Sequence, residues 1–270
     1  MRRETFHTPG RLTLDVRMPS GDMQLESADG DETTVELFSP RASADADEVI
    51  EATRIELRPR GDGQEVVVDV PRRRFRLFDF GGGDLALRVT APHGADVELS
   101  TASADAHGRG RFGSLKAELA SGDLRFDEVH GRADVKSASG DVYVERISRD
   151  ASIATASGDV TVEFVGGDAT LRSASGDVTV EEAASSVTVQ TASGDQRLNA
   201  VASGRVTMQS ASGDQLVGIR RGSRVHIDAK TMSGDTTSEL DVSDAPPSGD
   251  GPTLELRATA MSGDIRIVRA

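Results

Sequence analysis

The chain has 270 residues, enough for a substantial core in one or two domains, and a formal net charge of −14 at pH 7. Such an acidic chain is poorly suited to nucleic acid, and its low aromatic content (one Tyr, no Trp) argues against a surface that stacks bases or sugar rings. The absence of cysteine excludes disulfides and thiolate metal sites.

The start of the chain, residues 1–14, lacks the apolar stretch that forms the centre of an ordinary signal peptide. No apolar run approaches the length of a membrane-spanning helix. We therefore expect a cytoplasmic protein, peripheral to the inner membrane at most, whose membrane contact is only indirect.

Residues 1–94 show short alternating segments typical of β-strands, without a regular repeat. Residues 42–53 are rich in Ala, Asp and Glu, and are expected to form a short helix or an exposed excursion. We interpret this section as a degenerate version of the repeat that follows, or as a cap on it. The expected strands are 12–16, 22–25, 34–37, 54–57, 65–70, 75–78 and 85–89.

Residues 95–240 contain a regular repeat, whose most visible element is the triplet Ser-Gly-Asp. The triplet recurs every 18 residues in the middle of the chain, and its spacing loosens further on. A short fixed period of this kind is typical of a solenoid, in which each repeat forms one coil. The glycines and aspartates of these triplets are Gly122, Asp123, Gly140, Asp141, Gly158, Asp159, Gly176, Asp177, Gly194, Asp195, Gly213 and Asp214.

Each 18-residue unit divides into two nine-residue halves that begin apolar, polar, apolar. Residues 160–162 (Val-Thr-Val) open one half and residues 169–171 (Ala-Thr-Leu) open the next, which is the pattern of a strand with one buried face. Like residues recur at like positions, as expected if coils stack with parallel strands about 4.8 Å apart. The sequence therefore predicts an all-β, single-stranded parallel β-solenoid with two strands per coil. The SAS and TAS segments leave a third side as an open alternative.

The Ser-Gly-Asp triplets are interpreted as structural turns. Glycine supplies a positive φ at a sharp bend, and Ser and Asp side chains accept hydrogen bonds from backbone N–H groups that the bend frees. Stacked aspartates also suggest calcium, but one carboxylate per corner offers a cation too few oxygen ligands. We expect no cofactor, and no calcium binding beyond a weak association.

Residues 241–270 are expected to form a loop followed by closing strands at 254–258 and 264–268, after further strands at 224–227 and 235–240. The loop contains Pro246 and Pro247, which cannot donate to a strand ladder. The three sections, 1–94, 95–240 and 241–270, are interpreted as one continuous domain.

The remaining candidate motifs are weak. The five histidines show no metal-ligand spacing. The basic cluster 72–74 is better explained as a solvated strand edge than as a membrane or partner contact. Residues 60–62 (Arg-Gly-Asp) read like an integrin tripeptide, but turn chemistry explains them.

The segment 87–103, followed by the repeated pattern (T/S)-A-S-G-D-V, resembles the bacterial domain of unknown function DUF4097, labelled "putative adhesin" and also called toastrack. The likeness covers most of the chain and is strongest over residues 85–217. The resemblance implies a β-solenoid without catalytic residues, in proteins linked to envelope-stress systems and their membrane partners. The chain departs from the pattern at Ala104, which replaces the first corner glycine, and no secretion or membrane segment accompanies the repeat.

These observations favour a non-enzymatic scaffold or interaction module, which docks a protein partner on its wall or stacks its ends on another copy. Two alternatives stay open: an extracellular adhesin-like module exported by a non-standard route, and, less favoured, a carbohydrate-active enzyme. The regular outward residues Thr161, Thr179 and Thr188 are the candidate docking wall.

Overall fold

A computed structural model describes residues 1–41, 43–71, 85–240 and 252–270. The expected strand at 75–78, the basic cluster 72–74 and the prolines of the expected loop lie outside these residues. The chain divides into two compact units, Met1–Gly131 and Arg132–Ala270, and each is described by itself.

The first unit is built around two long parallel strands, β2 (Leu12–Ala28) and β7 (Asp96–Phe112). Each runs through a corner without interruption, and at Gly21 in β2 the backbone has a φ of 117°, which favours glycine. On its other side, β2 pairs with β5 (Gly63–Asp69) and β6 (Ala86–Pro92). β7 pairs in turn with β8 (Leu115–Leu119) and β9 (Leu124–Val129), so these strands form stacked coils.

Three further strands of the first unit pair antiparallel, unlike those of a regular solenoid. β3 (Glu32–Phe38) lies between β1 (Arg2–His7) and β6, and β4 (Arg54–Arg60) pairs with β5. The expected short helix is present as α1 (Ala44–Ala52), which buries Ala46 and Ile50. No helix in the described ranges is long and apolar enough to span a membrane.

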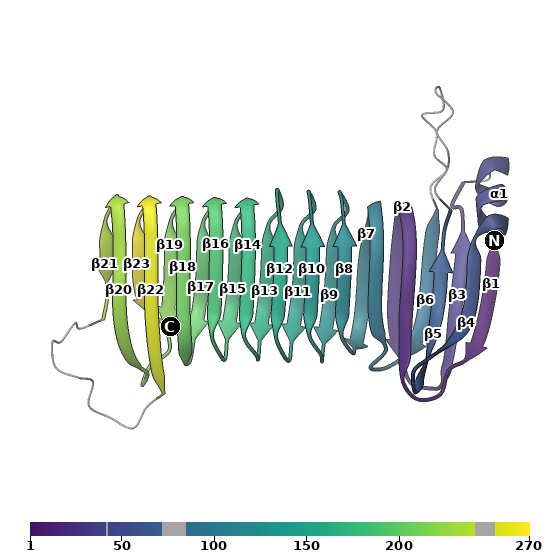
Figure 1. The fold of residues 1–270 in the computed structure, drawn as a ribbon, viewed down its shortest axis with the longest axis horizontal. Helices are drawn as coiled ribbons and strands as arrows, with labels where there is room; N and C mark the ends of the chain where they lie inside the picture. The colour runs from purple at the N-terminus through teal and green to yellow at the C-terminus, as the bar shows by residue number, and fades with distance from the viewer. Residues whose placement is uncertain (42, 72–84, 241–251) are drawn as a thin grey trace. The chain divides into compact units, whose positions relative to one another are not determined.

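The second unit consists of two rows of parallel strands, and each coil contributes one strand to each row (Figure 1). The first row, in stacking order, is β10 (Ala133–Ser137), β12 (Ala151–Thr155), β14 (Ala169–Ser175), β16 (Val187–Ser193), β18 (Gly204–Ser212), β22 (Thr253–Ser262) and β20 (Arg224–Ser233). The second row is β11 (Val142–Ile147), β13 (Val160–Val165), β15 (Val178–Ala183), β17 (Gln196–Val201), β19 (Gln215–Ile219), β23 (Ile265–Arg269) and β21 (Thr236–Ser238). The predicted parallel β-solenoid is confirmed.

The SAS and TAS segments continue the first row and form no separate row in the described part of the chain. Ser175 pairs with Ser193, and Ser193 pairs with Ser212. The predicted alternation is also present, because Val160 and Val162 are buried while Thr161 between them is half-buried. Burying one such valine contributes about 1.5 kcal/mol or more, so the repeated column is the main source of stability.

The final strands of the chain do not form the end of the stack. β22 lies between β18 and β20, and β23 lies between β19 and β21 (yellow and green in Figure 1). The two expected closing strands are therefore present, but as an inserted coil. The inward residues Leu254, Leu256, Ile265 and Ile267 of this coil are at most 1% exposed, whereas β21 contains only Thr and Ser. The more apolar coil thus occupies the position that is covered on both sides.

Candidate functional site

The aspartates of the Ser-Gly-Asp corners form a hydrogen-bonded ladder in the second unit. The Oδ1 atom of Asp141 accepts the backbone N–H of Asp159 at 2.9 Å, and the later aspartates up to Asp264 repeat this contact with the next coil. The distances are 2.8 or 2.9 Å throughout, including the inserted coil. We call this set the aspartate ladder: Asp141, Asp159, Asp177, Asp195, Asp214, Asp264 and Asp235. In the first unit, Asp105 accepts the N–H of Asp123 in the same way, at 3.0 Å.

The corner glycines are required mainly by close stacking. A Cβ atom on Gly176 would lie 2.2 Å from the carbonyl oxygen of Gly158, and one on Gly158 would lie 2.2 Å from that of Gly140. The expected positive φ occurs at Gly194 and Gly213 (139° and 127°) but not at these three glycines. The expectation that glycine serves the bend through its φ was therefore wrong for them, because the tight approach of successive coils is what excludes a side chain.

The corners of the first unit follow the same rule. A Cβ atom on Gly122 would lie 2.0 Å from the carbonyl oxygen of Ala104. Ala104 itself is fully buried, and its N–H donates to the Oγ1 atom of Thr101 at 2.7 Å. Alanine can therefore replace glycine at this corner, because the side chain of Ala104 lies in the core.

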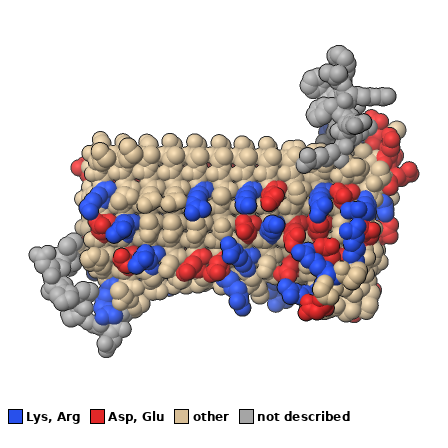
Figure 2. Space-filling model, viewed as in Figure 1, with Lys and Arg blue, Asp and Glu red and all other residues tan. Residues whose placement is uncertain are grey.

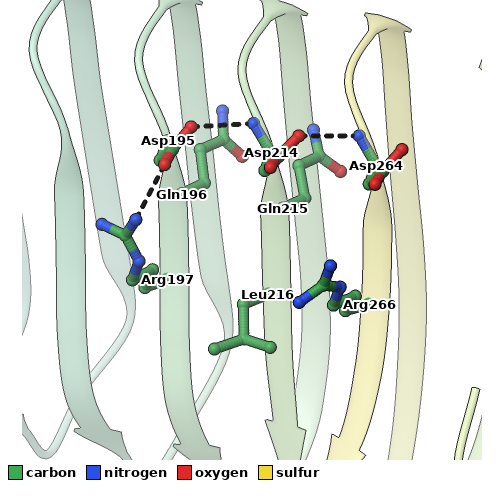
Figure 3. A pocket seen from close by; sticks show the side chains of 8 residues that line it. All are labelled: Asp195, Gln196, Arg197, Asp214, Gln215, Leu216, Asp264 and Arg266. Atoms are coloured by element: carbon green, nitrogen blue, oxygen red, sulfur yellow. Dashed lines mark hydrogen bonds and ion pairs between the residues drawn. The ribbon is translucent and has the colours of Figure 1, made fainter. Parts of the chain in front are cut away.

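One arginine neutralises part of the aspartate ladder. The guanidinium of Arg197 lies 2.7 Å from the Oδ2 atom of Asp195 and 3.4 Å from that of Asp177. Beside it is a hollow of about 140 Å³, between the ladder and the outward side chains Arg197, Leu216 and Arg266 (Figure 3). This volume is below the roughly 300 Å³ at which small-molecule pockets begin. Nowhere in the described ranges do three or more His, Asp or Glu residues come together as metal ligands.

A second ladder, which the sequence analysis did not anticipate, lies at the opposite corner of the coils between Asp150 and Arg205. The Oδ1 atom of Asp150 accepts the N–H of Asp168 at 3.1 Å. The Oδ1 atom of Asp168 accepts hydrogen bonds from the hydroxyl of Ser185 at 2.6 Å and from the N–H of Ser186 at 3.3 Å. The Oγ atom of Ser186 in turn accepts the N–H of Arg205. The signal for it was the recurrence of Asp or Ser at the start of every second half.

The three threonines of the candidate docking wall do not share a face. Thr161 and Thr179 are direct neighbours on β13 and β15 in the second row. Thr188 lies on β16 in the first row, between Thr170 and Thr207. The structure therefore contains two threonine columns, one on each row.

The first-row column is flanked by a ladder of side-chain hydrogen bonds. The Nε atom of Arg172 donates to Gln190 Oε1 at 3.0 Å, and the Nε2 atom of Gln190 donates to Gln209 Oε1 at 3.0 Å. These residues lie two positions after the threonines on the same strands, so they face the same way. We call this surface the threonine–glutamine wall: Thr170, Thr188, Thr207, Arg172, Gln190 and Gln209.

The second-row column has more charge around it. Two residues beyond Thr179, the carboxylate of Glu181 accepts the side-chain amide of Asn199 at 2.8 Å. The guanidinium of Arg146 lies 4.3 Å from the ring centre of Phe164, a cation–π contact. Figure 2 shows Lys and Arg side chains interspersed with Asp and Glu side chains over the visible face.

The Arg-Gly-Asp tripeptide of the first unit is tied into its surroundings. Arg60 donates to Glu65 at 2.7 Å and to Glu98 at 2.6 Å, and Gly61 takes a φ of 63° in the turn between β4 and β5. The hydrogen bond to Glu98 raises the pKa of Arg60 above its usual value. The guanidinium is therefore already engaged by two carboxylates of its own chain.

Comparisons with known proteins agree with this architecture. The family model described as Toastrack DUF4097 matches residues 10–267. A putative adhesin from Bacteroides fragilis NCTC 9343 superimposes with a TM-score of 0.50 and 13% identity, covering 99% of this chain and 96% of that one. A putative lipid binding protein from Parabacteroides distasonis ATCC 8503 gives 0.54 and 14%, with the same coverage. At such low identity these structural likenesses show the fold alone. No curated protein matches the chain.

Proposed function

The chain belongs to the Toastrack DUF4097 family, and from this premise we propose that it is a non-enzymatic binding module that docks a protein partner on the threonine–glutamine wall. The observation that carries the proposal is the chain of hydrogen bonds from Arg172 through Gln190 to Gln209. It holds long side chains in place before a partner arrives, so binding loses less side-chain entropy.

The chemistry of the wall suits an extended polar partner. Its threonines repeat once per coil, at the spacing of paired strands, and present hydroxyl groups that both donate and accept hydrogen bonds. A partner with regularly spaced polar groups, such as an extended peptide segment, matches this repeat. The link of the family to envelope stress makes membrane-associated stress-signalling proteins the first partners to test, at the cytoplasmic face of the inner membrane.

The test is a crosslinked pull-down from native cells, separated into cytosolic, membrane and secreted fractions. Thr188→Lys with Thr207→Lys should abolish partner recovery, because two lysines interrupt the wall. Thr161→Lys with Thr179→Lys is the matched control on the second row and should leave recovery unchanged. Full recovery with the first pair of substitutions would refute the threonine–glutamine wall.

An adhesin-like extracellular module is the alternative, and it is supported by the description of the Bacteroides fragilis structure. The same fractionation distinguishes the two proposals. Recovery outside the cell, bound to surface polymer, would support the adhesin and overturn the cytoplasmic scaffold.

A further inference from the structure

The coil formed by β20 and β21 is the end of the stack in the second unit. β20 pairs with β22 on one side, and no described residue pairs with its other edge. The inward residues Val225, Ile227 and Ala229 are only half-buried, whereas their neighbours on β22, which are apolar as well, are fully buried. This end therefore presents apolar side chains that the next coil would cover.

The open edge also presents backbone groups. The N–H of Arg224 donates toward β22, to the carbonyl oxygen of Pro252 at 2.8 Å. N–H groups alternate in direction along a strand, and β20 pairs with β22 in continuous register, so those of Val225, Ile227 and Ala229 point to the open edge. The aspartate ladder stops here as well, because the carboxylate of Asp235 receives no N–H from a further coil in the described chain.

We propose that this end is a self-association surface, on which β20 of one molecule pairs antiparallel with β20 of a second copy about a two-fold axis. Because a two-fold pairing matches each surface with itself, it covers both open ends at once and leaves neither edge exposed. The proposal goes beyond the docking of a partner on the wall and does not depend on it.

The charges on β20 select the register of this pairing. An axis through Ala229 places Asp228 opposite Lys230 of the second copy. It also places Lys230 opposite Asp228 of the second copy, so the register contains two attractive cross-strand pairs. Axes through Asp228 or Lys230 would place like charges directly opposite each other. An axis through Ile227 would oppose Arg224 and Lys230, both cationic.

Two registers place opposite charges against each other, one through Ala229 and one through His226. The register through Ala229 pairs more residues. It pairs the strand from Val225 to Ser233, and Ile227 then packs against Thr231 of the second copy on the inward face. An axis through His226 pairs Arg224 with Asp228 but leaves the second half of β20 unpaired. A lone lysine usually protects an edge strand from pairing, but here Asp228 two residues away supplies its complement.

The test is sedimentation of the full chain over a range of concentrations, which should show a monomer–dimer equilibrium. Lys230→Asp should weaken the dimer about tenfold or more, because it places Asp228 opposite a second acidic residue. This substitution also breaks the ion pair within the strand, where Lys230 Nζ lies 3.0 Å from Asp228 Oδ1. The double exchange Asp228→Lys with Lys230→Asp restores both arrangements. It also places a lysine beside Arg257 of β22, whose Nε lies 3.5 Å from Asp228 Oδ2, so it should recover only part of the affinity.

Two further variants separate pairing from general charge. Ala229→Pro removes an N–H at the open edge and should give a monomer with an unchanged circular dichroism spectrum. Lys136→Asp makes the same charge change on the exposed surface of β10 and should leave the dimer intact. A chain that is monomeric up to its solubility limit, or a dimer unaffected by Lys230→Asp and Ala229→Pro, would overturn the proposal. Neither result bears on the wall, which the pull-down tests separately.

Discussion

At the scale of single residues, the corner aspartates act through one oxygen atom. In each aspartate of the ladder except Asp235, which ends it, Oδ1 accepts a backbone N–H from the neighbouring coil. The hydrogen bond requires an acceptor at this position, whereas the negative charge adds repulsion between aspartates stacked one above the next. Substitutions can therefore separate the effect of the hydrogen-bond acceptor on stability from the effect of the negative charge.

Asp159 allows this separation, since it is exposed and makes no ion pair among the described residues. Asp159→Ala should lower the free energy of unfolding by about 1 kcal/mol, because the N–H of Asp177 loses its acceptor. Asp159→Asn keeps an oxygen in place and should be neutral or slightly stabilising. Urea unfolding measures both, and equal losses in the two variants would show that charge matters more than the hydrogen bond.

Gly176 tests the close approach of the coils. Gly176→Ala would place a Cβ atom 2.2 Å from the carbonyl oxygen of Gly158, so two coils must separate locally. We expect a loss of about 3 kcal/mol in the free energy of unfolding, measured by the same urea titration. Ser175→Ala, at the exposed position just before it, is the control and should change stability little. A fully stable Gly176→Ala variant would contradict the stacking explanation.

At the scale of elements, the inserted coil of β22 and β23 holds the end of the second unit together. It is the only described connection between β18–β19 and β20–β21 by strand pairing. Its inward residues Leu254, Leu256 and Ile265 are fully buried. The coil β20–β21, with few buried side chains of its own, depends on this neighbour for its place in the stack.

Ending the chain after residue 252 tests this dependence. Without β22 and β23, the amides of β20 lose their strand partner and should exchange with solvent as fast as those of an unfolded segment. The amides of β14 and β15, several coils away, should keep their protection. Hydrogen exchange read by mass spectrometry measures both. Retained protection in β20 would mean that it can pair with β18 directly.

At the scale of the whole molecule, both units stack their coils in an order that differs from the order of the chain. In the first unit, β2 lies between β7 and the pair β5 and β6, although β5 and β6 follow it in sequence. In the second unit, β22 and β23 enter ahead of β20 and β21. The solenoid tolerates this because every coil offers the same backbone edge to its neighbour.

The repeat was enough to predict the parallel solenoid, because alternation and period depend on local sequence. It was not enough to predict the stacking order, because Ile227 and Leu256 are both apolar and either could lie next to Val206. The competition between coils places Leu256 there, with Ile227 beyond it. The placement of Thr188 was missed for a related reason. Threonines recur in both halves of each unit, and sequence alone does not say that Thr161 and Thr188 belong to different rows.

The order of the last coils has a consequence during synthesis. β20 and β21 leave the ribosome before the coil on which they pack has been made. The growing chain can add coils one at a time up to β19. The next strands, β20 and β21, then have no coil to pack against until β22 and β23 emerge. Over this interval the edge of β18 and β19 is exposed, and a chaperone or a neighbouring nascent chain has access to it.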